Sequence, residues 1–262
     1  MIEFQDSGSS FYQLIQSRYP QLFLSPSEWP NKQTESPLSV PHGTTVLAIQ
    51  YQEGVVMAGD RRATEGYSIS ERRIEKVYTV DRYSAVAIAG AAGPCMELCR
   101  LLRIELEHYE KLEGERLSCE GKANKLAQMI KGNLPMAMQG LVVLPIFASY
   151  DEIKKVGRIF KYDVAGGQYE EIEYCSIGSG GRDARGSLKK IFKKGMSEEA
   201  AVGAALEALY DAAEGDIATG GPDMIRNIYP IVKVISQKGV TDVAEDKIKT
   251  ILEVIIRKVG EA

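Results

Sequence analysis

The chain has 262 residues, of which 44% are hydrophobic and 26% are charged, as is usual for a globular protein of one large or two small domains. Its net charge is −4 and no long run has one sign, which argues against nucleic acid or an anionic membrane as the main partner. No apolar run is long enough to span a bilayer, and the N-terminus Met1–Asp6 lacks the features of a signal peptide. With four cysteines and no CxxC pair, the chain is expected to be cytoplasmic.

Residues 1–43 differ in composition from the rest of the chain. They contain five of the ten prolines and the only tryptophan, Trp29. Such composition is poorly suited to regular structure. Two interpretations are open, a tail or linker without regular structure and a removable propeptide.

From Thr45 onward, dense apolar patterns predict regular elements. The first strands are expected at 45–51, 55–59, 76–80 and 83–89. A helix follows at about 94–112, with Cys95 and Cys99 on its apolar face, where buried thiols are expected. Ser118 is the predicted N-cap of a second helix, which Pro135 should kink or end.

In the second half of the chain, strands are again followed by helices. Strands are predicted at 141–149, 157–163 and 169–177, then helices at 183–194 and 197–213. Strands at 228–235 and 240–243 and a helix at 245–259 complete the chain. Segregated strands and helices of this kind favour two packed antiparallel sheets with helices outside.

Histidine is too scarce for several common catalytic and metal sites. His42 belongs to the proline-rich leader, and His108 lies in the middle of a predicted helix, where a surface position is expected. A Ser-His-Asp or Cys-His enzyme and a multi-histidine metal site are therefore hard to build. Gly178–Gly181 also lacks the third glycine of a dinucleotide-binding loop.

The segment Gly43-Thr44-Thr45 offers a different kind of nucleophile. If the chain is cut before Thr44, the threonine hydroxyl can attack and the freed α-amine can act as the base. An α-amine titrates at roughly 7.7–8.0, which suits a base near neutral pH. Such a site also needs a cation near the amine, a backbone N–H for the oxyanion and a substrate pocket.

Several motifs together resemble the β subunits of the bacterial 20S proteasome, and the resemblance covers essentially all of residues 41–262. Each motif alone is weak evidence, but their order and spacing are highly specific. The motifs are Pro41–Thr45, Met57–Arg62, Lys76–Tyr78, Ala87–Gly90, Leu106–Gly114, Gly178–Gly180 and Asp216–Asp223.

This resemblance implies roles for individual residues. Thr44 corresponds to the nucleophile, Asp60 and Lys76 to an essential ion pair, and the Gly90 N–H to the oxyanion donor. Ser179, Asp216 and Thr219 correspond to groups that hydrogen-bond around the threonine amine, although the family often has serine where Thr219 stands. The implied substrate-binding residues are mainly apolar, which predicts cleavage after hydrophobic residues: Ala63, Thr64, Ile74, Ile88, Ala92 and Met96.

The resemblance also implies a fold, an activity and partners. The fold is the α+β four-layer αββα sandwich of N-terminal-nucleophile hydrolases, formed by residues 44–262. The activity is that of a threonine endopeptidase acting on unfolded polypeptides, released when the chain cuts itself between Gly43 and Thr44. The expected partners are identical β subunits in heptameric rings, α-subunit rings and a ring-shaped ATPase, with no metal or organic cofactor.

Three alternatives remain open at this point. A non-catalytic assembly subunit would be marked by the loss of Thr44, Asp60 or Lys76, and all three are present. The two-ring bacterial threonine protease shares a Thr-Thr start, but its subunits are shorter and lack a leader of this length. A small-molecule amidase of the same broad fold need not form stacked rings.

Overall fold

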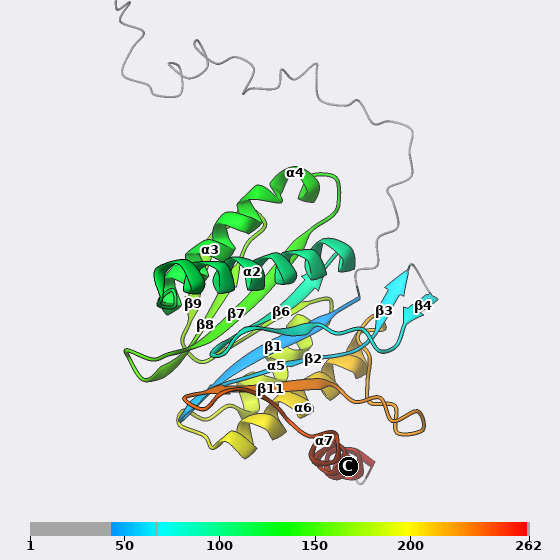
Figure 1. Cartoon of the computed structure of the whole chain (residues 1–262). Coiled ribbons are helices and arrows are strands. Elements are labelled where there is room, and N and C mark those ends of the chain that lie inside the picture. Colours follow the sequence, from blue (N-terminus) through cyan, green and yellow to red (C-terminus); the bar gives the residue numbers. More distant parts are fainter. Residues whose placement is uncertain (1–42, 66–67, 261–262) are drawn as a thin grey trace, which may run out of the picture. The chain divides into compact units, whose positions relative to one another are not determined.

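A computed structural model describes residues 43–65 and 68–260 of the chain (Figure 1). The expected leader, apart from Gly43, lies outside these residues. Within the described part, two five-stranded antiparallel sheets form the centre.

The first sheet has the strand order β10-β1-β2-β11-β12. Its strands are β1 (Thr45–Tyr51), β2 (Gly54–Gly59), β10 (Tyr174–Gly178), β11 (Ile231–Ser236) and β12 (Gly239–Asp242). The second sheet has the order β5-β6-β7-β8-β9. Its strands are β5 (Val77–Asp81), β6 (Ser84–Gly90), β7 (Val143–Asp151), β8 (Val156–Tyr162) and β9 (Gln168–Glu171).

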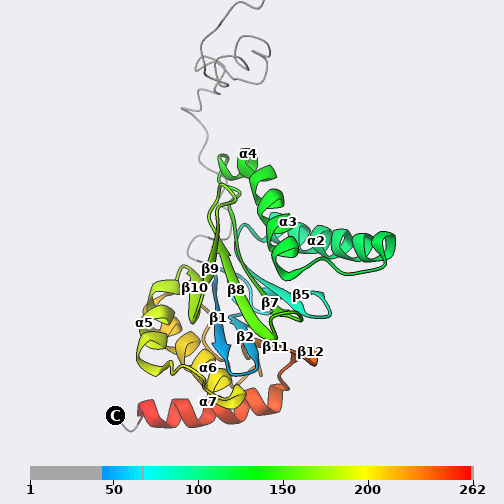
Figure 2. The same cartoon turned by 90° about the vertical axis from the view of Figure 1, so that its left-hand side faces the viewer.

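Helices cover the outer face of each sheet, as Figure 2 shows. Helices α2 (Ala92–Glu113) and α3 (Cys119–Gly132) pack on the second sheet, and the short α4 (Leu134–Ala137) follows α3. Helices α5 (Gly181–Ile191) and α6 (Glu198–Gly215) pack on the first sheet, and α7 (Glu245–Gly260) packs against α6. The predicted four-layer αββα sandwich is therefore confirmed.

Strand β1 shows why the sheets lie in the middle of the sandwich. Its apolar run is buried on both faces, so consecutive side chains enter different cores. Leu47 and Ile49 join the core beneath α5 and α6, whereas Val46 and Ala48 join the core between the two sheets. A third core lies beneath α2 and α3. Three cores between four layers explain the high apolar content of the central strands.

Local signals define the helix ends. The Ser118 hydroxyl accepts a hydrogen bond from the Gly121 N–H at 3.0 Å, which confirms the predicted N-cap of α3. Ser197 caps α6 in the same way through the Ala200 N–H. Helix α2 ends at Gly114, whose φ of 74° is the left-handed conformation that glycine adopts readily. Pro135 lies in α4, one turn beyond the end of α3.

The structure differs from the sequence expectations in several places. The single strand predicted at 169–177 is two strands, because β9 pairs with β8 in one sheet and β10 pairs with β1 in the other. The chain thus crosses between the two sheets near Ile172, and the local sequence pattern does not reveal this crossing. A small hairpin of β3 (Ala63–Glu65) and β4 (Ser68–Glu71) was also missed, since both strands are short and polar.

The strand predicted at 228–235 begins later, at Ile231. Pro230 has no N–H to donate to a ladder, so β11 starts directly after it. Among residues 43–65 and 68–260, no helix combines the length and apolar character needed to cross a bilayer.

Candidate active site

Strand register brings the predicted site residues to one end of the two sheets. Val46 is paired with Gly59, so the start of β1 lies beside the end of β2 and Asp60 follows immediately. Thr45 is paired with Gly178, which places Ser179 beside Thr44. Lys76 precedes β5 and Gly90 ends β6 in the facing sheet. The site therefore forms where strand ends from both sheets converge.

Asp60 is a fully buried carboxylate whose oxygens are saturated with donors. Oδ1 accepts from Lys76 Nζ and from the Thr45 N–H, both at 2.7 Å. Oδ2 accepts from the N–H groups of Arg62 at 2.8 Å and Gly220 at 2.9 Å. A buried charge of this kind is tolerated only when it is paired and hydrogen-bonded. Asp60 consequently has a fixed position relative to the start of β1.

Lys76 is equally well satisfied, with only 3% of its surface exposed. Its ammonium donates to Asp60, to the Arg62 carbonyl oxygen and, at 3.0 Å, to the carbonyl oxygen of Gly43. These three bonds use all the donors that an ammonium has. Burial lowers the pKa of Lys76, and the neighbouring Asp60 carboxylate opposes that change. The cation is thus directed at the peptide bond before Thr44.

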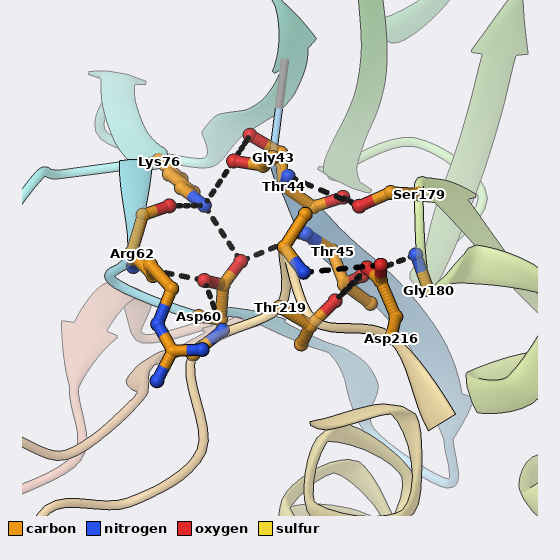
Figure 3. A network of polar contacts seen from close by, with 12 residues as sticks. Gly43, Thr44, Thr45, Asp60, Arg62, Lys76, Ser179, Gly180, Asp216 and Thr219 are labelled. Atoms are coloured by element: carbon orange, nitrogen blue, oxygen red, sulfur yellow. Dashed lines mark hydrogen bonds and ion pairs between the residues drawn. The ribbon is translucent and has the colours of Figure 1, made fainter. Parts of the chain in front are cut away.

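Gly43 and Thr44 form the centre of the site (Figure 3). The Thr44 hydroxyl donates to the Gly43 carbonyl oxygen at 2.7 Å, so this oxygen accepts from both Thr44 and Lys76. Two donors on one carbonyl polarise it and make its carbon more electrophilic. A Cβ on residue 43 would lie 2.7 Å from the Ala218 carbonyl oxygen, which explains why glycine is required here.

The other side of Thr44 is formed by the residues that follow β10 and α6. The Ser179 N–H donates to the Thr44 carbonyl oxygen at 2.8 Å, and the Thr44 N–H reaches the Ser179 hydroxyl at 3.4 Å. Asp216, which caps the C-terminus of α6, accepts from the Thr219 hydroxyl at 2.6 Å. That hydroxyl also lies 2.6 Å from the Thr45 hydroxyl.

The structure thus brings Ser179 into direct contact with Thr44, while Thr219 reaches Thr45 and Asp216. Desolvation alone would raise the pKa of Asp216, but the Ser179 and Thr219 hydroxyls and the backbone N–H groups of Ala218 and Thr219 lower it below its ordinary value. Asp216 therefore supplies a negative charge next to the Ser179 and Thr219 hydroxyls.

A mainly apolar pocket opens beside Thr44. Five of the six predicted substrate-binding residues line it, together with Gly43, Thr44, Lys76 and Gly90: Ala63, Ile74, Ile88, Ala92 and Met96. Thr64 is not part of this lining, and it lies instead beside Gly43. Glu75 and Cys95 also line the pocket and were missed. Their neighbours Ile74 and Met96 provided the only signal for them.

Two features of the pocket wall matter for chemistry. Gly90 has a φ of +124°, and a Cβ there would overlap the Val142 carbonyl oxygen, so only glycine fits this turn at the end of β6. Cys95 is 2% exposed, and burial raises the pKa of its thiol to about 12. The thiol is therefore an inert wall of the pocket at neutral pH.

Sequence reasoning did not single out the groups that complete the site through their backbone. The N–H groups of Arg62 and Gly220 and the carbonyl oxygen of Arg62 hold the Asp60–Lys76 pair. Thr45, with its side chain buried, contacts both sides of the site. The position of Thr45 directly after Thr44 was the one available signal.

Comparison with known proteins gives a consistent result. Residues 40–226 match the family model described as "Proteasome subunit". A protein named "Proteasome subunit beta" from Acidimicrobium ferrooxidans is 56% identical over 224 residues, which are 84% of this chain and 82% of that protein. One of the same name from Acidothermus cellulolyticus is 50% identical over 256 residues, covering 96% of this chain and 88% of the relative.

A third relative with this name, from Frankia casuarinae, is 55% identical over 217 residues, 83% of this chain and 79% of its own length. The matched region contains the site described above, and the two-sheet architecture is the one that the resemblance implied. The chain belongs to the proteasome subunit family, and within it to the β subunits.

Proposed function

We propose that this chain is a catalytic threonine endopeptidase subunit and that Thr44 is its nucleophile. One observation carries the proposal. The buried Asp60–Lys76 pair is directed at the Gly43–Thr44 peptide bond, and the Thr44 hydroxyl lies 2.7 Å from the carbonyl oxygen of that bond. Neither a buried ion pair nor a threonine at a strand start is unusual alone, but together they place a nucleophile against a polarised carbonyl.

The same geometry supports removal of residues 1–43 by the chain itself. The Thr44 oxygen attacks the Gly43 carbonyl carbon, the C–N bond breaks and the nitrogen takes the proton, which leaves an ester between the two residues. Water then adds to the ester and releases the leader with a carboxylate at Gly43. The reaction frees the Thr44 amine, which lies beside the Ser179 hydroxyl, a group that also bonds to Asp216.

In peptide hydrolysis, the freed Thr44 hydroxyl attacks the scissile carbonyl and the amine carries the proton to the leaving group. The Gly90 N–H is the proposed oxyanion donor, because Gly90 lines the same pocket as Thr44. The apolar lining favours substrates with a hydrophobic residue before the cut. No metal or organic cofactor takes part in this scheme.

Membership in the β subunits implies a multi-subunit proteasome. Rings of identical β subunits, rings of α subunits and an ATPase ring are the proposed partners, and unfolded polypeptides are the proposed substrates. Enclosing Thr44 within such rings would protect folded cytoplasmic proteins from hydrolysis.

The decisive test is Thr44→Ala in the assembled particle, with Thr79→Ala on the exposed side of β5 as the matched control. We expect Thr44→Ala to keep the leader and to lose peptide hydrolysis, whereas Thr79→Ala behaves as the unmodified protein. Intact mass reports the cut, and the loss of Trp29 from the β chain reports it independently. Normal leader removal in Thr44→Ala would exclude self-cleavage by this residue.

A further inference from the structure

Thr45 is bonded through its N–H, its carbonyl oxygen and its hydroxyl to the residues around Thr44. Its side chain is fully buried. Its N–H donates to Asp60 Oδ1 at 2.7 Å, and its carbonyl oxygen accepts from the Asp60 N–H at 3.1 Å. Its hydroxyl accepts from the Gly180 N–H at 3.0 Å and lies 2.6 Å from the Thr219 hydroxyl. Thr45 thus contacts both sides of the site.

The direction of the hydroxyl chain follows from counting protons. A threonine hydroxyl has one proton to donate, and that of Thr219 is used on Asp216 Oδ2 at 2.6 Å. The Thr45 hydroxyl must therefore donate to Thr219. The chain runs from the Gly180 N–H through Thr45 and Thr219 to the Asp216 carboxylate, as Figure 3 shows.

The hydrogen bonds at position 45 require a hydroxyl and not only a residue that favours strands. Threonine is common in strands because of its branched Cβ, and valine has the same shape. A valine at position 45 would fill the same space but would leave the buried Gly180 N–H without an acceptor. A Cβ on Gly180 would lie 2.6 Å from the hydroxyl oxygens of both Thr45 and Thr219. The backbone at Gly180 therefore approaches these two hydroxyls as closely as glycine permits.

We propose that Thr45 is a positioning residue that joins the Asp60–Lys76 pair to the Thr219–Asp216 pair and thereby fixes Thr44. The inference rests on the proposed function of Thr44. Once the leader is removed, Thr44 is the terminal residue and Thr45 is its only covalent attachment. A chain terminus is mobile unless it is held, and Thr45 holds this one through its backbone to Asp60 and through its side chain to Thr219.

The experiment compares Thr45→Val with Thr45→Ser in the particle purified with its partner subunits. Thr45→Val removes the hydroxyl and should lower kcat by about tenfold to a hundredfold, because a misplaced Thr44 reacts more slowly. KM should stay unchanged. Thr45→Ser keeps the hydroxyl and should restore most of kcat. Leader removal, followed by intact mass, should slow in Thr45→Val and recover in Thr45→Ser.

Ser149→Ala is the matched control, since it removes a buried hydroxyl that is bonded to Ser84 in another part of the fold. It should leave kcat unchanged. If Thr45→Val does not assemble, Thr45→Ala removes the same hydroxyl with a smaller side chain and must lower kcat equally. Adding Thr219→Val to Thr45→Val or to Thr45→Ala should lower kcat little further, because both substitutions break the same chain of hydrogen bonds.

The outcomes separate this inference from the proposed function. Turnover that persists in Thr44→Ala overturns both. An inactive Thr44→Ala together with a fully active Thr45→Val overturns the positioning role alone. A loss of kcat in Thr45→Ser as large as that in Thr45→Val, or a change confined to KM, also contradicts it.

Discussion

Two buried ion pairs lie at the two ends of strand β5, and they differ in what their lysines contact. Lys76 precedes the strand and is 3% exposed, whereas Lys122 of α3 is 4% exposed and pairs with Asp81, the last residue of the strand. Both pairs have a closest distance of 2.7 Å. By burial and pairing alone, the two lysines are equivalent.

Their remaining contacts distinguish them. Lys122 donates to the Ser84 hydroxyl at 3.3 Å, so its bonds join a helix to the end of a hairpin. Lys76 donates to the carbonyl oxygen of Gly43, beside a threonine hydroxyl. A buried ion pair is thus weak evidence of catalysis, and the group that the cation polarises is the stronger evidence.

The largest expected effect comes from replacing each lysine by methionine. Lys76→Met should slow leader removal on the order of 10²–10³-fold, and lower peptide hydrolysis with it, because it removes the cation that polarises the Gly43 carbonyl. It should also destabilise the fold by about 3–5 kcal/mol, since Asp60 remains buried without its counterion. Peptide hydrolysis and chemical unfolding of the assembled particle measure the two effects separately.

Lys122→Met is the matched variant at the other end of β5. It should destabilise by about 1–3 kcal/mol, since Asp81 is 12% exposed and partly solvated, while activity per assembled particle stays unchanged. Equal losses of activity in the two variants would contradict the functional distinction between the two pairs.

Self-processing should also depend on pH through Lys76. Desolvation lowers the pKa of this ammonium below the ordinary 10.5, with Asp60 opposing the change. The cation is present below that lowered pKa and is lost as pH rises through it, so processing should begin to slow below pH 10.5. The decline should approach about tenfold per pH unit, as for the loss of one proton.

Processing rates from intact mass, measured after assembly is started at each pH, test this dependence. Far-UV circular dichroism over the same range shows whether the fold is intact. A constant processing rate up to pH 10.5 in a folded protein would remove the Lys76 cation from the mechanism.

The smallest expected effect concerns the hollows beside the two lysines. Met96 lines the pocket next to Lys76, and Ile153 lines a more polar hollow next to Lys122. Met96→Ala should weaken binding of peptides with a large apolar residue before the cut by about 1–2 kcal/mol, seen as a higher KM. Ile153→Ala should leave KM unchanged. A panel of fluorogenic peptides makes the comparison, and a preference for basic residues would overturn the assigned specificity.

Much of the fold could be predicted because its signals are local. The strand at Thr45–Tyr51 and the cap at Ser118 follow from side-chain pattern and hydrogen-bonding capacity within a few residues. The split of 169–177 into two strands could not be predicted, because its sheet partners lie elsewhere in the chain. The β3–β4 hairpin lacks the apolar alternation that marks a strand.

The site shows the same division. Ser179 was predicted beside Thr44 and is found there, but Thr219 bonds to Thr45 rather than to Thr44. Thr64 was predicted in the pocket, whereas the structure places it beside Gly43. The backbone donors of Arg62 and Gly220 carry no side-chain signal at all, because every residue except proline has an N–H.

The sequence by itself determined the types and the order of the reactive groups: a glycine before two threonines, a scarcity of histidine, and single acidic and basic residues at strand ends. Only the tertiary structure decided which of two equally buried lysines reaches Gly43 and that Thr45 connects the two sides of the site. The reason is physical. Composition and pattern act over a few residues, whereas contacts between residues far apart in the chain depend on strand register and on the packing of two sheets.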